Sequence, residues 1–338
     1  MILLVGTFPP PIGGVTVHVK RLLTLLSNNR KDVTFFDIRD FAGNKKNNVK
    51  IYITTINRLR KESNNAIIHY QLNNWLELFV ICILCHKSYK IYTTVHSFRW
   101  NEYNLIVKMA FRLCEKASKI QYVAPSQSIK EELVYRGVKT KKINIISTYL
   151  PPAKEEYKER VPKEIMSFLK RTNNIIVLAN ASKLYKDKSG IDVYGMDMCI
   201  EACYRLKTHS FIFCVPQYDT KYMLECKKSI RKYDLQDRFY IYTGLTNLVP
   251  ILKSVDCFVR PTSTDSYGIS VAEAINVGVP SIASDVCERE EGTIIFKSRD
   301  IDDFCKKLQK IKKNNKVKTN SRNYYLKYQE MYQNITKI

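Results

Sequence analysis

The sequence contains no apolar run long enough to cross a membrane, although 45% of its 338 residues are hydrophobic. A transmembrane helix needs about 20 consecutive apolar residues. The longest apolar stretch runs from Trp75 to Cys85 and includes Glu77, so it predicts a helix of the protein core. The chain opens on an apolar strand at 1–5, without a basic region and cleavage site before it, so we expect no secretory signal peptide.

Several common site motifs are also missing. The ten cysteines show no framework spacing, which favours reduced thiols over disulfides. Cys82-Ile-Leu-Cys85-His86 has the spacing of a haem attachment motif, but it lies on the apolar stretch and we interpret it as chance. The loop after the first strand has neither a Gly-x-Gly-x-x-Gly fingerprint nor a Walker sequence, which disfavours a nicotinamide dinucleotide.

Acidic residues are few relative to basic ones, and the formal net charge is +23. Residues 1–150 hold 23 Lys and Arg against 9 Asp and Glu, a net of +14, and residues 151–338 hold 32 against 23, a net of +9. A basic surface can bind anionic lipid, phosphorylated substrates or nucleic acid. The abundance of Lys, Ile, Asn and Tyr, as in proteins from A+T-rich genes, offers a purely compositional alternative. No stretch interleaves basic and aromatic residues, so we expect no nucleic acid partner.

Strands and helices alternate along both halves of the chain. In the first half we expect strands at 1–5, 33–36, 66–70, 90–96, 120–125 and 143–146. We expect a loop followed by a helix over 13–26, and helices at 75–85, 104–117 and 128–137. After a linker at 149–163 we expect strands at 175–178, 210–215, 239–243, 257–260 and 282–284, with helices at 198–206, 248–253 and 324–333. Such alternation predicts α/β domains with parallel sheets covered on both faces. We therefore expect two doubly wound, Rossmann-like domains at 1–160 and 161–338, the second ending in a C-terminal helix.

The most informative stretch runs from Arg260 to Ser284. Two carboxylates, Asp265 and Glu273, stand eight positions apart around a turn that opens a helix of small residues. The residues of that turn are Ser266, Tyr267, Gly268 and Ile269. A helix N-terminus holds phosphate well, a carboxylate one turn inside it can accept from a ribose diol, and one on the preceding loop can accept from sugar hydroxyls. Diphosphate, ribose and hexose are the parts of a nucleotide sugar.

This layout resembles the Glu-x7-Glu signature of retaining nucleotide-sugar glycosyltransferases of family 4 (group 1), including those that build bacterial O-antigens and other polysaccharides. The resemblance runs over essentially the whole chain, but Asp265 replaces the usual first Glu. It implies the GT-B fold, in which two doubly wound domains face each other across a cleft, and a UDP- or GDP-sugar donor. It also implies that Glu273 holds the ribose and that Asp265 orients the sugar as a catalytic residue.

In the first half, the resemblance implies further site residues. Gly13-Gly14, after the first strand, looks like the glycine turn that family members place near the donor phosphates and the acceptor. His96 ends a strand at a position where family members often have a His that contacts the donor sugar or an active-site water, and we count it as catalytic. His18, on the first helix, is expected to pack or to point to solvent.

In the second half, the family commonly uses an Arg and a Lys to bind the leaving diphosphate. Lys183 stands where the Arg is expected, and either Lys186 or Lys188 could supply the second cation, of which we favour Lys188. Gly244 ends a strand at the expected contact to the nucleotide base. No Asp-x-Asp motif lies near these residues, so we expect neither a metal nor another cofactor.

Together these features favour a cytoplasmic glycosyltransferase on the inner face of the membrane. We expect it to move a sugar with retention to a lipid-linked oligosaccharide, bound at an anionic membrane surface. Two alternatives stay open: a GT-B nucleotide-sugar 2-epimerase, which would share the fold and the donor, and a basic nucleic-acid-binding protein.

Overall fold

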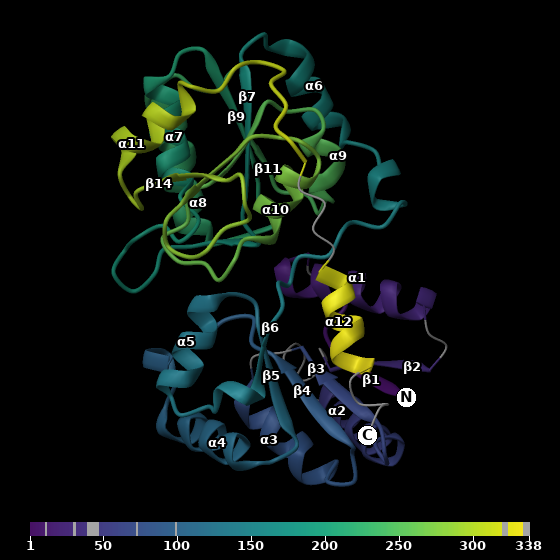
Figure 1. Ribbon diagram of the computed structural model, residues 1–338. Coiled ribbons are helices and arrows are strands. Elements are labelled where there is room, and N and C mark those ends of the chain that lie inside the picture. The colour runs from purple at the N-terminus through teal and green to yellow at the C-terminus, as the bar shows by residue number, and fades with distance from the viewer. Residues whose placement is uncertain are drawn as a thin grey trace. The chain divides into compact units, whose positions relative to one another are not determined.

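The computed structural model divides the chain into two compact units, which we describe separately (Figure 1). Unit 1 comprises Met1–Leu150 and Asn323–Ile338, and unit 2 comprises Pro151–Arg322. The structure describes residues 1–10, 12–29, 32–38, 47–71, 74–98, 100–319 and 324–333. Within these residues each unit has its own hydrophobic core around a parallel sheet, which confirms the two doubly wound domains that the sequence predicts.

The sheet of unit 1 has six parallel strands in the order β2-β1-β3-β4-β5-β6. Their bounds are β1 (Ile2–Gly6), β2 (Val33–Asp37), β3 (Ile67–Tyr70), β4 (Lys90–Thr94), β5 (Ile120–Ala124) and β6 (Ile143–Ile145). Each of these strands was expected from its apolar run, because strands covered on both faces are apolar throughout. Strand β1 is fully buried and pairs with β2 on one side and β3 on the other.

The helices that connect these strands are α1 (Gly14–Asn29), α2 (Asn47–Glu62), α3 (Trp75–Leu84), α4 (Leu105–Lys116) and α5 (Gln127–Tyr135). Three of them begin where a polar side chain accepts a hydrogen bond from a backbone N–H in the first turn, namely at Asn74, Asn104 and Ser126. Helix α2 was not predicted, because its stretch Ile51–Ile56 is rich in β-branched residues that favour strands.

The C-terminal helix α12 (Tyr324–Gln333) packs on unit 1, whereas the sequence analysis placed it in the second domain. Its buried side chains join the cluster that contains Ile2 and Leu4 of β1. The hydroxyl of Tyr92 donates to the backbone oxygen of Met331 at 3.1 Å, and Tyr325 donates to that of Leu25 at 3.0 Å. The sequence could not predict this, because nothing in the local sequence indicates that the chain crosses back to unit 1 after unit 2.

Helix α3 confirms the expected helix at 75–85, but it is not enclosed by the core. Leu78 and Ile81 are buried, as is Glu77, which accepts a 2.7 Å hydrogen bond from the hydroxyl of Tyr70. Its opposite face, with Ile83 at 54% exposure, is turned to solvent. Among the described residues, no helix combines the length and the apolarity that a bilayer crossing requires.

The sheet of unit 2 also has six parallel strands, in the order β11-β9-β7-β12-β13-β14. Their bounds are β7 (Ile175–Asn180), β9 (His209–Cys214), β11 (Phe239–Tyr242), β12 (Cys257–Arg260), β13 (Ser281–Ser284) and β14 (Ile294–Phe296). A separate parallel pair is formed by β8 (Lys183–Leu184) and β10 (Gln217–Tyr218). Strands β8, β10 and β14 have three residues or fewer and were not predicted.

The helices of unit 2 are α6 (Lys163–Arg171), α7 (Met196–Arg205), α8 (Thr220–Lys232), α9 (Leu248–Leu252), α10 (Ile269–Asn276) and α11 (Ile301–Leu308). Helices α7, α9 and α10 were expected. Helix α8 was missed because charged residues dominate it, although four of its side chains are buried and Asp219 caps it. All ten cysteines lie in described segments and are free thiols, as their spacing in the sequence predicts.

Candidate functional site

In unit 2, the chain moves from β7 outward to β11 and then returns to β12 beside β7. In doubly wound sheets, ligands bind at such a reversal, outside the carboxyl ends of the strands. Arg260, the last residue of β12, donates from Nη1 to the backbone oxygen of Asn180, the last residue of β7, at 3.1 Å. The side chain of Arg260 therefore lies at the point of unit 2 where a ligand is expected.

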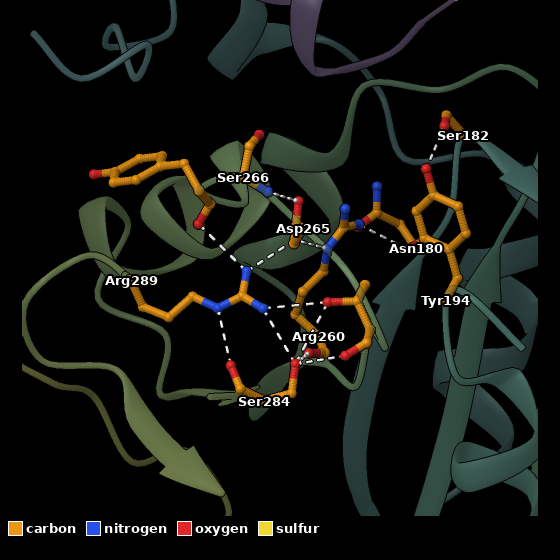
Figure 2. A network of polar contacts seen from close by, with 10 residues as sticks. Asn180, Ser182, Tyr194, Arg260, Asp265, Ser266, Ser284 and Arg289 are labelled. Atoms are coloured by element: carbon orange, nitrogen blue, oxygen red, sulfur yellow. Dashed lines mark hydrogen bonds and ion pairs between the residues drawn. The ribbon is translucent and has the colours of Figure 1, made fainter. Parts of the chain in front are cut away.

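Asp265 lies between two arginine side chains at this point (Figure 2). Its Oδ2 is 2.9 Å from Nε of Arg260 and 2.8 Å from Nη1 of Arg289. The side chains of Arg260 and Asp265 are 12% exposed, and that of Arg289 is 1% exposed. Burial alone would raise the pKa of Asp265, but the two guanidinium groups outweigh it and hold the pKa well below its usual range. Two cations around one carboxylate leave this cluster with a net positive charge.

The guanidinium of Arg289 is held by protein groups on every side. Besides Asp265, it donates from Nε to the backbone oxygen of Ser284 at 3.1 Å and from Nη2 to Oγ1 of Thr262 at 3.2 Å. A longer bond of 3.3 Å from Nη1 reaches the backbone oxygen of Tyr267. These bonds join the segment after β13 to the end of β13 and to the loop between β12 and α10, so Arg289 is a structural anchor of the site rather than a group that is free to meet a ligand.

Helix α10 begins directly beside this cluster. Its first flanking residue, Gly268, has φ of +82°, and a Cβ built there would lie 2.7 Å from Nη1 of Arg289. Glycine is needed for both reasons, and it leaves the helix without a side-chain cap. Glu273, one turn inside, is 6% exposed. The positive end of the helix and the net charge of the cluster thus reinforce each other.

Aromatic and polar groups continue the network toward β8. The guanidinium carbon of Arg260 lies 5.0 Å from the ring centroid of Tyr194, and the hydroxyl of Tyr194 lies 2.8 Å from Oγ of Ser182 (Figure 2). Helix α7 starts at Gly195, whose φ is +73° and whose added Cβ would lie 2.2 Å from the backbone oxygen of Pro261. The start of α7 is therefore packed closely against the loop that follows β12.

The three candidate lysines differ in their contacts. Lys186 is paired with Glu225, with Nζ 2.7 Å from Oε2. Lys183 on β8 and Lys188 in the following turn are exposed, and neither ammonium group makes a hydrogen bond or ion pair with any residue that the structure describes. Of the two alternatives for the second cation, the paired Lys186 is thus the one already engaged by the protein.

Comparisons with known proteins give one family match and matches to solved structures. Residues 189–314, which include Arg260, Asp265, Glu273 and Arg289, match the family model described as Glycosyl transferases group 1. The matched segment lies within unit 2 and is similar to the domain of group 1 glycosyltransferases. A search of the curated proteins finds no match to the sequence.

Solved structures show that the chain has the GT-B fold. The Anabaena protein Alr3699/HepE, solved in complex with UDP and glucose, is 12% identical with a TM-score of 0.73, and the match covers 100% of both chains. Sucrose-phosphate synthase from Thermosynechococcus elongatus is 13% identical with a TM-score of 0.68, over 91% of this chain and 89% of that one. WaaG, a glycosyltransferase involved in lipopolysaccharide biosynthesis, is 11% identical with a TM-score of 0.59, over 92% and 91%.

In unit 1, strand order reverses between β1 and β3, and buried histidines gather there. Nε2 of His96 lies 3.1 Å from Oε1 of Gln71, and Nε2 of Gln71 lies 2.9 Å from Nε2 of His69. Since a side-chain amide donates only through its nitrogen, these contacts assign the proton of His96 to Nε2 and that of His69 to Nδ1. His96 then presents an unprotonated Nδ1.

His18, on α1, is fully buried, so it packs rather than points to solvent. Its Nδ1 donates to the backbone oxygen of Thr148 at 2.7 Å, and its ring lies 5.4 Å from that of His96. Burial lowers the pKa of His18 to about 4, although the hydrogen bond with Thr148 partly opposes this effect. Gly13 and Gly14 stand one turn earlier, where Thr16 closes the turn by donating to the backbone oxygen of Gly13 at 3.1 Å.

The predicted site residues therefore fall into two groups, one in each unit. In unit 2, Asp265, Ser266 and Gly268 lie at the arginine cluster, whereas the side chain of Tyr267 turns to Glu290, to which its hydroxyl donates. Gly244 follows β11 at the edge of the sheet, where a Cβ would lie 2.3 Å from the hydroxyl of Tyr242. The roles of these residues remain predictions.

Sequence reasoning missed four residues that the structure brings into these sites: Arg260, Arg289, His69 and Gln71. Arg260 and Gln71 could have been found, since each is a polar residue at the carboxyl end of an apolar strand. Within the described ranges, no three His, Cys, Asp or Glu side chains are grouped to hold a metal ion.

Proposed function

We propose that this enzyme transfers a sugar from a nucleoside diphosphate sugar, with retention, to a lipid-linked surface oligosaccharide. The observation that carries the proposal is the uncapped start of α10 beside a buried cluster of net positive charge, at the strand reversal of unit 2. A helix N-terminus and nearby positive charge both favour the binding of a diphosphate. The similarity to structures solved in complex with UDP and with UDP-glucose supports a donor of this class.

In this proposal the donor lies along the carboxyl ends of the unit 2 strands. The diphosphate faces the turn from Ser266 to Ile269, and Glu273 accepts hydrogen bonds from the ribose. Backbone groups at Gly244 contact the base. Lys183, assisted by Lys188, approaches the diphosphate, because neither ammonium group has a partner among the described residues.

The reaction breaks the bond between the anomeric carbon and the diphosphate oxygen, and the electron pair leaves with the diphosphate. Negative charge grows on that oxygen in the transition state, so catalysis depends on positive groups placed in advance. Lys183, the start of α10 and the arginine cluster supply that charge, and we therefore propose no metal for this step. The acceptor hydroxyl forms the new bond on the same face of the sugar, and its proton passes to the departing diphosphate.

For Asp265 we propose a second task beside the expected one of orienting the sugar. Its Oδ2 accepts from two guanidinium groups and its Oδ1 accepts from the N–H of Ser266 at 3.0 Å. We assign it the task of holding the arginines and the turn in place, with one lone pair of Oδ1 left for a sugar hydroxyl. In unit 1, the unprotonated Nδ1 of His96 can accept from a sugar hydroxyl or a water.

The acceptor part of the proposal rests on the family resemblance and on the net charge of +14 over residues 1–150. Such charge attracts a protein to anionic lipid, so we place the enzyme on the inner face of the cytoplasmic membrane.

The proposal is tested by incubating the purified protein with UDP- and GDP-sugars, with and without a lipid-linked acceptor. We expect acceptor-dependent release of UDP or GDP and a product with the anomeric configuration of the donor. Formation of a 2-epimer of the donor without transfer would instead identify a nucleotide-sugar epimerase. Turnover of no nucleotide sugar would overturn the assignment.

A further inference from the structure

Two neighbouring helices of unit 1 expose an unusual amount of apolar surface. On α3 the exposed side chains are Leu76, Val80 and Ile83. On α4 they are Leu105, Ile106, Met109 and Leu113. All seven are between 38% and 73% exposed, and we call them the α3–α4 patch. The single charged residue of α3, Glu77, is buried, so α3 presents no charged side chain to water.

The two exposed faces are continuous with each other. Helices α3 and α4 lie side by side (Figure 1), with the rings of Trp75 and Phe111 4.9 Å apart and Sγ of Cys114 donating to the backbone oxygen of Trp75 at 3.9 Å. The exposed residues of α3 are four and three positions apart in the sequence. On α4, Ile106, Met109 and Leu113 are three and four positions apart. Each set therefore forms one stripe along the outer side of its helix, and the stripes run beside each other.

Basic side chains border this patch. Trp100, just before α4, has the charged groups of Lys108, Arg112 and Arg136 at 5.4, 5.7 and 4.9 Å from its ring centroid. Lys116, at the end of α4, is exposed as well. Glu102 and Glu115 are the acidic residues between Trp100 and Lys116, and Glu132 is paired with Arg136 at 2.9 Å, so the four basic side chains outnumber these three acidic ones. An apolar face with a rim of Lys, Arg and Trp is the arrangement that binds in the interface of a bilayer.

We propose that the α3–α4 patch docks on an anionic lipid bilayer and inserts its apolar side chains among the lipids. The proposal rests on the proposed function, because a lipid-linked acceptor would be presented at that surface. A second copy of the chain is a less suitable occupant. In a symmetric dimer the same patch would meet itself and bring the basic rims of both copies together.

The test compares two variants, each of which replaces an exposed apolar side chain by glutamate. Their binding is measured by cosedimentation with anionic vesicles of phosphatidylglycerol and phosphatidylcholine, and with neutral vesicles of phosphatidylcholine alone. Met109→Glu places a charge in the α3–α4 patch. Leu224→Glu, at an apolar side chain of 54% exposure on α8 of unit 2, is the matched control. We expect the wild type and Leu224→Glu to bind the anionic vesicles, and Met109→Glu to bind at least tenfold more weakly. High salt should weaken binding without abolishing it, since the apolar contact is not screened.

Unchanged binding of Met109→Glu, or no binding of the wild type, would overturn the proposal. So would light scattering that shows a wild-type dimer and a Met109→Glu monomer, because the patch would then be an interface between copies. Release of UDP or GDP from the donor without vesicles separates the two proposals. Vesicle binding without turnover of the donor would support this inference and overturn the proposed function. Sugar transfer without vesicle binding would support the proposed function and overturn this inference.

Discussion

Replacing Asp265 by alanine should destabilise unit 2 strongly. The substitution leaves Arg260 and Arg289 as adjacent cations, with side chains 12% and 1% exposed and no carboxylate between them. Removing one partner of a buried ion pair typically costs about 3–5 kcal/mol, because the remaining charge stays buried and uncompensated. We expect a loss in this range, since the two cations also repel each other at short distance.

The assay must report on unit 2 alone. The two tryptophans of the chain, Trp75 and Trp100, belong to unit 1, so their fluorescence in urea follows unit 1, whereas far-UV circular dichroism follows both units. The change in circular dichroism that has no counterpart in fluorescence reports the unfolding of unit 2. Asp265→Ala should move this change to a lower urea concentration. Asp302→Ala serves as the control, because Asp302 is paired with Arg205 at 2.6 Å but is 85% exposed, and exposed pairs contribute little.

A loss for Asp265→Ala no larger than that for Asp302→Ala would refute this reasoning. It would mean that the guanidinium groups find water or other partners when the carboxylate is removed. The double variant Asp265→Ala with Arg289→Met should recover part of the loss, because it also removes one of the two uncompensated cations.

Three further outcomes are expected. Gly268→Ala should destabilise unit 2 more than Gly190→Ala in urea, because both glycines have positive φ but only at Gly268 would the new Cβ meet a guanidinium group. Lys183→Met should lower the turnover number by about 10²-fold with the donor and acceptor at saturation, while Lys186→Met, which removes a lysine already paired with Glu225, should not. The unfolding free energy of unit 1, followed by tryptophan fluorescence, should fall as the pH is lowered from about 6.5 toward 4, by about 1.4 kcal/mol per pH unit for each buried histidine. The sign follows from the lowered pKa values, since unfolded histidines take up protons in this range before folded ones do; replacing His18 by glutamine should make the fall less steep.

Most of the fold could be predicted from the sequence because its strands are buried on both faces. Apolar runs such as 1–5 and 66–70 are strong signals, and the alternation with helices leads to parallel sheets. The segments that were missed lack such a signal. Strands β8 and β10 have two residues each, and α8 carries many charged side chains around a narrow buried face.

The site could be predicted only as far as local sequence reaches. The turn at Gly268 and the buried Glu273 belong to one continuous stretch of sequence. As this stretch predicts, Gly268 precedes the helix and Glu273 lies one turn inside it. The pairing of Asp265 with Arg289 depends on how the loop after β13 returns to the start of α10, which no periodicity encodes. The contact of His69 with Tyr332 spans 263 positions and requires α12 to come back to unit 1.

The most direct test of the central claim is a calorimetric titration of the protein with UDP and with GDP. The wild type should bind one of them, and Glu273→Gln, which keeps the volume of the side chain, should bind it about tenfold to hundredfold more weakly, because a hydrogen bond to a charged group contributes about 1.5–3 kcal/mol. Equal affinity of the two proteins for the nucleotide, or no binding of either nucleotide by the wild type, would contradict the placement of a nucleotide-sugar site at the start of α10.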